Sequence, residues 1–139
     1  MKKKAYELIE HTADIGIKVK AKDLKGLFSQ SALAMFDIIA EEKSTNNKPQ
    51  KIKIEQSADD LESLFVNWLN ELLSLSAVKE LIFYDFQINK IDKNLLQAVA
   101  VGRSVHDYKV NVEIKAATYH ELKIEKLEDD WQAQVIFDV

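Results

Sequence analysis

Glu10-His11-Thr12-Ala13-Asp14-Ile15-Gly16 leads into Ile17-Lys18-Val19-Lys20-Ala21, and the rest of the chain is organised around this run. Apolar and polar residues alternate over 15–21, which predicts a strand with one buried face. The opposite face carries Asp14 next to Gly16, the residue type that allows another backbone or an ion to approach closely. A carboxylate there can face out of the fold and bind a ligand. The alternative is that Asp14 ends a turn and that His11 is an ordinary surface side chain.

Length and composition limit the class of protein. The 139 residues fit one domain, 1–139, with a single core. The absence of cysteine excludes disulfides, thiolate zinc sites and cysteine nucleophiles. A formal net charge of −4 gives no general attraction to nucleic acid, so direct nucleic-acid binding is not expected. Met1-Lys2-Lys3-Lys4 is not followed by a signal-peptide core, and no run is long enough to span a bilayer. We expect a cytoplasmic protein.

Apolar residues at helical spacing predict two helices. Asp23 is placed to cap the first, and its apolar stripe is Leu24, Leu27, Phe28, Ala32, Met35, Phe36 and Ile39. Ser57-Ala58-Asp59-Asp60 offers a capping start to the second, and its wider stripe is Leu61, Leu64, Phe65, Trp68, Leu72 and Leu75. Trp68 is therefore expected to be a core or interface anchor. The polar segment 41–50 is predicted to be an exposed loop.

Strand patterns dominate elsewhere. Residues 51–56 alternate, and further strands are predicted at 81–91, 95–102, 108–119, 121–127 and 131–139. Short breaks favour antiparallel neighbours, so a β-meander is expected to close the chain. The order of elements predicts an α+β fold in which two amphipathic helices pack on one face of a largely antiparallel sheet. The other face of that sheet is then free for chemistry.

Polar residues converge on this open face. The last strand has one apolar face, so Asp138 points the other way, and Lys115 shares a face with Glu113. Two carboxylates, Asp14 and Asp138, with nearby backbone carbonyls suit a hard divalent cation such as calcium, magnesium or manganese. The alternative is that both are charged edge residues that discourage aggregation, with Lys115 as their salt-bridge partner.

Other catalytic signatures are weak or absent. The sequence has no glycine-rich phosphate loop, no Gly-x-Ser-x-Gly elbow and no histidine pair at helical metal spacing. His11 and His120 are candidates to join the carboxylates in a metal or acid–base role, although a lone histidine is more often structural or exposed.

From Tyr6 to Val139 the chain resembles the archease family, and the order and spacing of the shared motifs make the resemblance specific. The motifs are His11-Thr12-Ala13-Asp14, Leu33-Ala34-Met35-Phe36, Trp68-Leu69-Asn70-Glu71-Leu72-Leu73, Lys115-Ala116-Ala117-Thr118-Tyr119-His120 and Val135-Ile136-Phe137-Asp138-Val139.

The resemblance implies a small α+β protein that is not itself an enzyme. Archeases act as protein cofactors of the RtcB-type tRNA-splicing RNA ligase, helping guanylylation of its active-site histidine and allowing multiple turnover. Asp14 and Asp138 match the paired metal-binding acids of the family, with calcium or manganese as the ion. Lys115 matches a position that contributes to activation, and His11, Thr118, Tyr119 and His120 are weaker candidates for activation or partner contact.

The chain departs from the family pattern at Gly102-Arg103, where many archeases have Gly-Glu. If that acid helps to bind the metal or partner in relatives, this chain does so differently. Two competing functions stay open. One is a chaperone-like module that binds proteins through exposed apolar surface around Trp68 or the helix edges, without a metal. The other is a metal-dependent hydrolase that uses Asp14, Asp138 and His11.

Overall fold

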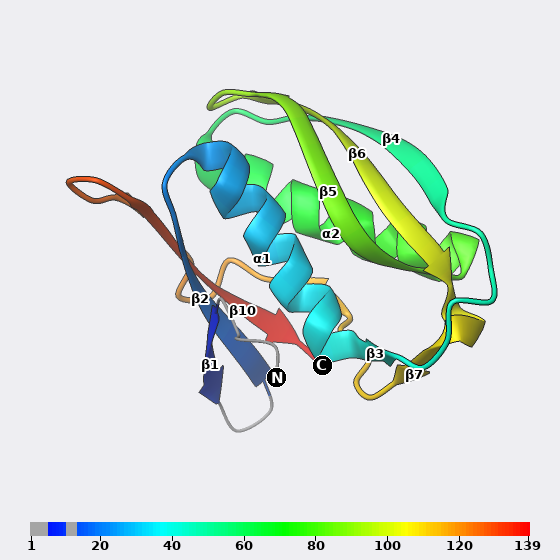
Figure 1. Cartoon of the computed structure of the whole chain (residues 1–139). Helices are drawn as coiled ribbons and strands as arrows, with labels where there is room; N and C mark the ends of the chain where they lie inside the picture. The colour runs from blue at the N-terminus through cyan, green and yellow to red at the C-terminus, as the bar shows by residue number, and fades with distance from the viewer. Residues whose placement is uncertain (1–5, 11–13) are drawn as a thin grey trace.

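The computed structural model describes residues 6–10 and 14–139, and Figure 1 shows their arrangement. The first sheet is built around β2 (Asp14–Ala21), the strand that the alternation at 15–21 predicts. β2 lies between β1 (Tyr6–Glu10) and β10 (Trp131–Asp138). On its other side β10 pairs with β8 (Ala116–Ala117) and β9 (Lys123–Lys126), and these pairings are all antiparallel.

A second antiparallel sheet has the order β4 (Gln50–Ser57), β6 (Leu95–Ser104), β5 (Leu81–Ile91). A shorter pairing joins β3 (Ala40–Glu42) to β7 (Tyr108–Val110), which follows the 3-10 turn η1 (Val105–Asp107). The sequence patterns did not predict β1 or β3.

The helices α1 (Leu24–Ile39) and α2 (Leu61–Lys79) lie between the two larger sheets, and each contacts strands of both (Figure 1). The side chains of Asp23 and Asp60 accept hydrogen bonds of 2.7 Å from the backbone N–H groups of Gly26 and Ser63. Such a cap satisfies a donor that the first helical turn leaves unpaired. The cap predicted at Asp23 is confirmed, and Asp60 is the capping residue of the second helix.

Trp68 is the central anchor of the core. Its side chain is 0% exposed, its indole N–H donates to the Phe28 carbonyl oxygen at 3.0 Å, and its ring meets Phe86 edge to face at 5.9 Å. The prediction of a core role is confirmed. The competing proposal of an exposed apolar surface around Trp68 is wrong, because packing between the helices and the second sheet covers the whole side chain.

The α+β class, the two amphipathic helices and the antiparallel strands are confirmed. The strands divide among separate sheets, however, and the last ones do not form a continuous meander. β4 and β5 pair with the two sides of β6, so the segment that follows β6 cannot pair with it. That segment instead turns through η1 and pairs with other strands. Neither helix in the described ranges is long and apolar enough to cross a membrane.

The segment 108–119 was predicted as one strand and is two, β7 and β8. Between them, the backbone N–H groups of Asn111 and Val112 donate to the Ile39 carbonyl oxygen at 2.8 and 3.2 Å, whereas that of Lys115 donates to the Asp138 carbonyl oxygen at 2.8 Å. The segment therefore passes from the end of α1 to the end of β10. Because its hydrogen-bond partners change along its length, it cannot form one regular strand.

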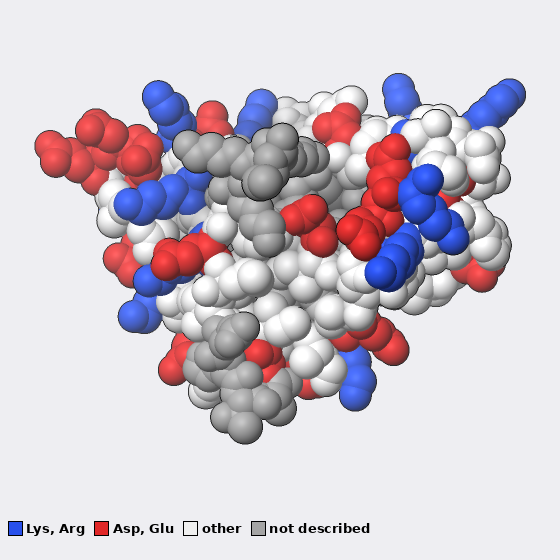
Figure 2. Space-filling view, turned by 60° about the horizontal axis from the view of Figure 1, so that its bottom comes forward, with Lys and Arg blue, Asp and Glu red and all other residues white. Residues whose placement is uncertain are grey.

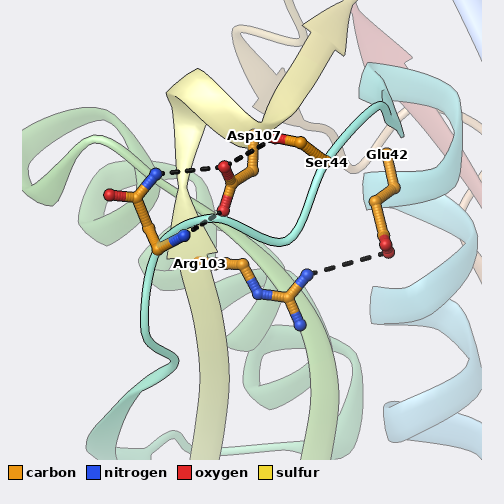
Figure 3. A network of polar contacts seen from close by, with 5 residues as sticks. Glu42, Ser44, Arg103 and Asp107 are labelled. Atoms are coloured by element: carbon orange, nitrogen blue, oxygen red, sulfur yellow. Dashed lines mark hydrogen bonds and ion pairs between the residues drawn. The ribbon is translucent and has the colours of Figure 1, made fainter.

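Asp107 fixes the loop that follows β3. Its carboxylate is 1% exposed and accepts hydrogen bonds from the Ser44 hydroxyl at 2.8 Å and from the backbone and side-chain amides of Asn47 at 3.0 Å (Figure 3). Burial acts to raise the pKa of the Asp107 carboxyl. Hydrogen bonds from Asn47, Ser44 and Asn46 outweigh burial and hold this pKa below its ordinary value.

Replacing Trp68 by Phe tests the core. The substitution removes the hydrogen bond to Phe28 and leaves a cavity, so we expect the free energy of unfolding in a denaturant titration to fall by roughly 1–3 kcal/mol. Val78→Ala on the same helix is the matched control, because Val78 is 78% exposed, and it should change this free energy by less than about 0.5 kcal/mol. Equal effects of the two substitutions would contradict the assigned anchor role.

Asp107→Asn tests the loop network through its pH dependence. A carboxyl whose pKa is lowered by folding stabilises the fold above its unfolded pKa and loses that contribution as pH falls through the folded pKa. The loss of stability caused by Asp107→Asn should therefore be largest near neutral pH and shrink below about pH 4. Thermal unfolding over a pH series measures this difference, with exposed Asp129→Asn as the charge-matched control. A loss that stays constant down to pH 2 would refute the assignment.

Candidate metal and partner-binding site

The two carboxylates predicted to form a site lie directly opposite each other. In the antiparallel pairing of β2 with β10, Asp14 is the partner of Asp138. Directly opposite residues project from the same face of a sheet, with Cβ atoms about 4.5–5.5 Å apart. Asp14 is partly exposed and Asp138 is exposed, so both can be reached from outside. The pairing brings together two residues that are far apart in the sequence.

The strands that carry these acids have neighbours on both sides, although the described pairing of β2 with β1 ends at Ile15. β2 lies between β1 and β10, and β10 pairs on both sides, so neither strand is an edge strand. Within the described ranges, no ion pair joins Lys115 to either carboxylate. Like charges directly opposite each other destabilise a strand pair. The pairing therefore puts two like charges at directly opposite positions of the sheet.

Gly16 lies two residues after Asp14 on β2 and leaves room for the side chain of Ile136. It lies opposite Ile136 of β10 and Ile9 of β1. A Cβ atom at Gly16 would lie 2.6 Å from Cδ1 of Ile136 and 3.1 Å from Cβ of Ile9, closer than side chains pack. The sequence indicated that a backbone or an ion approaches Gly16, but the structure places an isoleucine side chain there. Ile136 is 1% exposed and fills the sheet surface beside the carboxylates.

Lys115 begins a segment that is fastened to β10. Its backbone N–H donates to the Asp138 carbonyl oxygen at 2.8 Å. Three residues later, both the N–H and the hydroxyl of Thr118 donate to the Ile136 carbonyl oxygen, at 3.0 and 2.8 Å. The side chain of Lys115 is exposed. A cationic side chain therefore starts beside the carboxylate pair, and Thr118 acts as an anchor of the segment.

Asn70 of α2 holds the other side of this segment, and the sequence analysis gave it no role. Its side-chain oxygen accepts from the Ala117 N–H at 2.7 Å and its side-chain NH₂ donates to the Ala117 carbonyl at 3.2 Å. The amide thus pairs with β8 as a further strand would. The sequence feature that could have indicated this role is the position of Asn70 on α2 between the buried residues Leu69 and Leu72. A partly buried polar side chain beside an apolar stripe needs hydrogen-bond partners.

The remaining candidates are His11, Tyr119 and His120. His11 lies outside the described residues. Tyr119 is 58% exposed and lines a separate open hollow with residues from the start of α2 and the β5–β6 turn. His120 is also exposed. The structure therefore brings Asp14, Asp138 and the backbone of Lys115 together, and it places Tyr119 on another part of the surface.

The donor set is small and its surroundings carry both signs of charge. Over residues 6–10 and 14–139, no group of three or more histidine, cysteine, aspartate or glutamate side chains is arranged to hold a metal. Figure 2 shows acidic and basic side chains interleaved on the face it presents, without a continuous basic stripe. Two carboxylates alone leave most positions around a cation open to water or to groups from another molecule.

Comparison with known proteins covers nearly the whole chain. A model of the Archease protein family matches residues 6–139. A protein archease from Methanosarcina acetivorans is 38% identical over 142 residues, spanning 98% of this chain and 97% of its own. A protein archease from Pyrococcus abyssi is 39% identical over 143 residues, spanning 98% of this chain and 99% of its own.

Solved structures share the fold. The solution structure of protein 1598 from Methanobacterium thermoautotrophicum has a TM-score of 0.74 and 28% identity, covering 99% of this chain and 100% of its own. The crystal structure of an archease from Thermotoga maritima, described as a possible chaperone, has a TM-score of 0.64 and 24% identity, covering 94% of each chain. At that identity the second likeness concerns the fold alone.

Asn70→Ala tests whether the amide holds the Lys115 segment. It removes two hydrogen bonds to partly buried backbone, so the free energy of unfolding should fall by roughly 1–3 kcal/mol. The amide hydrogen of Ala117 should also exchange faster with solvent, as measured by NMR. Asn67→Ala, three residues earlier on the same helix, is the matched control. An unchanged Ala117 exchange rate in Asn70→Ala would contradict the proposal that Asn70 holds this segment.

Proposed function

The chain belongs to the archease family, and from this premise we propose that it is a protein cofactor of an RtcB-type RNA ligase in tRNA splicing or RNA repair. In this role it promotes guanylylation of the ligase's active-site histidine and multiple turnover, and it catalyses no reaction of its own. We place this activity in the cytoplasm. The observation that carries the proposal is the direct opposition of Asp14 and Asp138, with Lys115 tied to the same strand end.

A divalent cation fits the residues that are present. Asp14 and Asp138 would hold it, since opposed carboxylates repel each other and supply hard oxygen ligands. Such ligands suit calcium or manganese rather than a soft metal. The site offers two carboxylates and leaves other ligand positions open, which suits a cation shared with a partner or with nucleotide phosphates.

The chemistry of histidine guanylylation explains why such a site is useful. When bound, a divalent cation neutralises triphosphate charge and stabilises the leaving pyrophosphate. Lys115 is exposed and its backbone is bonded to Asp138, which supports a role in which its ammonium group meets a phosphate or an acidic side chain of the ligase. Asn70 hydrogen-bonds to the backbone of Ala117, and the Thr118 hydroxyl donates to the Ile136 carbonyl oxygen. These two contacts hold the segment that follows Lys115 against α2 and β10.

The weaker candidates take roles at the periphery. Tyr119 and His120 are exposed on the loop after β8, and they are proposed as further contacts of the ligase. His11 precedes Asp14 by three residues and is proposed as a further contact at the carboxylate end. Direct nucleic-acid binding is not expected to take part, because the net charge is −4.

RNA-ligase turnover with a matched RtcB-type ligase, GTP and manganese tests the function. We expect the wild-type protein to stimulate turnover, and Asp14→Ala and Asp138→Ala each to lose most of the stimulation. Asp85→Ala removes an exposed acid of β5, on the other sheet, and should stimulate like the wild type. Stimulation that survives both losses and chelation would favour a chaperone-like module. Turnover of a substrate by the purified protein alone would favour a hydrolase.

Cation binding is tested separately from ligase stimulation. Calorimetric titration with Ca²⁺ and Mn²⁺ should show binding to the wild-type protein, and Asp14→Asn or Asp138→Asn should weaken it by at least about tenfold. A cation at a hundredfold excess over its Kd should also raise the free energy of unfolding by about 2.7 kcal/mol, and EDTA should reverse the gain. Equal binding by the wild-type protein and the Asp14→Asn, Asp138→Asn double variant would refute the site.

A further inference from the structure

Arg103 is the single arginine in a sequence that contains 18 lysines, and its side chain is largely buried. It lies in β6 with 13% of its side chain exposed. The guanidinium carbon is 4.7 Å from the centre of the Tyr84 ring (Figure 3 shows the side chain). A planar guanidinium stacks on an aromatic face and presents its donors in a fixed fork. The position is therefore one that lysine would fill poorly.

One donor nitrogen of this guanidinium is left without a hydrogen bond within residues 6–10 and 14–139. Nη1 is buried and has no hydrogen-bond partner in the described part of the chain. Its ion pair is with Oε2 of Glu42 at 3.8 Å, longer than a hydrogen bond (Figure 3). The Glu42 side chain is 53% exposed. A buried cationic donor without a partner is costly, so this site favours any carboxylate that can approach more closely.

The backbone on both sides of Glu42 is fixed. Glu42 pairs with Tyr108 in the register of β3 with β7. The next two backbone N–H groups, of Lys43 and Ser44, donate to the Asp107 carbonyl oxygen at 2.9 and 3.1 Å. The backbone of Glu42 is therefore held at its present distance from Arg103, whereas the Glu42 side chain can rotate away from the guanidinium. A ligand carboxylate would meet a guanidinium that is already held in place.

We propose that Arg103 is a recognition site for a carboxylate side chain of a protein partner, and that Glu42 is the internal carboxylate it displaces. A planar carboxylate forms two parallel hydrogen bonds with a guanidinium fork. The site already accommodates one carboxylate at long range, that of Glu42, which favours a singly charged carboxylate over a more highly charged phosphate. The proposal rests on Arg103 and its neighbours and stands without the cation site.

Tyr108 is the register partner of Glu42, so its phenol projects from the same face of the β3–β7 pair. Burial raises its pKa, with the negative charge of Glu42 acting in the same direction and the positive charge of Arg103 opposing it. Its hydroxyl group therefore stays protonated at neutral pH. β7 ends at Val110, and five residues later the backbone N–H of Lys115 donates to the Asp138 carbonyl oxygen. A short segment of the chain therefore connects the neighbourhood of Arg103 to the carboxylate pair.

NMR of the single arginine provides a direct test. The Nε–Hε group of Arg103 gives one resonance, which is followed while acetyl-Ala-Glu-Ala-amide is added to the full chain. We expect this resonance and the backbone amides of Tyr84 and Glu42 to shift with saturation. The same peptide with Gln in place of Glu should cause no such shift, and inorganic phosphate should bind more weakly than the Glu peptide.

Two conservative variants complete the test. Glu42→Gln removes the internal competitor, so the peptide should bind several-fold more tightly. Arg103→Lys keeps the charge but loses the fork and the stacking, so shifts at Tyr84 and Glu42 should disappear. The proposal is overturned if wild type and Glu42→Gln show no binding, if the Gln peptide or phosphate binds as well as the Glu peptide, or if Arg103→Lys binds as well as the wild type.

Discussion

The antiparallel pairing of β2 with β10 is the constraint on which the rest of the structure depends. One face of this pair buries Ile17, Val19, Val135 and Phe137 in the core, and the other face carries Asp14 opposite Asp138. A slip of one residue would send each apolar side chain to the wrong face. Gly16 under Ile136 helps to fix the register, because a larger residue there would collide. The same register that builds the core therefore sets two carboxylates against each other.

Local sequence patterns were enough to predict the elements and the faces of this pair. Alternation predicted β2 and β10, helical spacing predicted α1 and α2, and strand parity predicted that Asp14 and Asp138 turn away from the apolar face. The register that makes them direct neighbours is a contact between the two ends of the described chain, which no local pattern encodes. Local patterns also could not predict the division of 108–119 into two strands. Its backbone N–H groups donate to Ile39 at one end and to Asp138 at the other, and both are distant in the sequence.

Tertiary contacts also decided the roles that sequence reasoning missed. Asn70 was visible only as a polar residue on a buried helix, and its function appears once Ala117 lies beside it. Arg103 was noted as a departure from the family pattern, and its buried, loosely paired state depends on Tyr84 and Glu42 from other strands. β3, which carries Glu42, was too short to show a period, and it exists because β7 pairs with it.

We propose that the paired ends of β2 and β10 hold a divalent cation. Substoichiometric Mn²⁺ broadens the NMR signals of nuclei near the place where it binds, so it locates that place directly. If Asp14 and Asp138 hold the cation, the amides of Gly16, Ala116 and Ile136 should broaden strongly, and the broadening should be lost in the Asp14→Asn, Asp138→Asn double variant. Broadening centred on another surface, or unchanged in the double variant, would contradict the proposal.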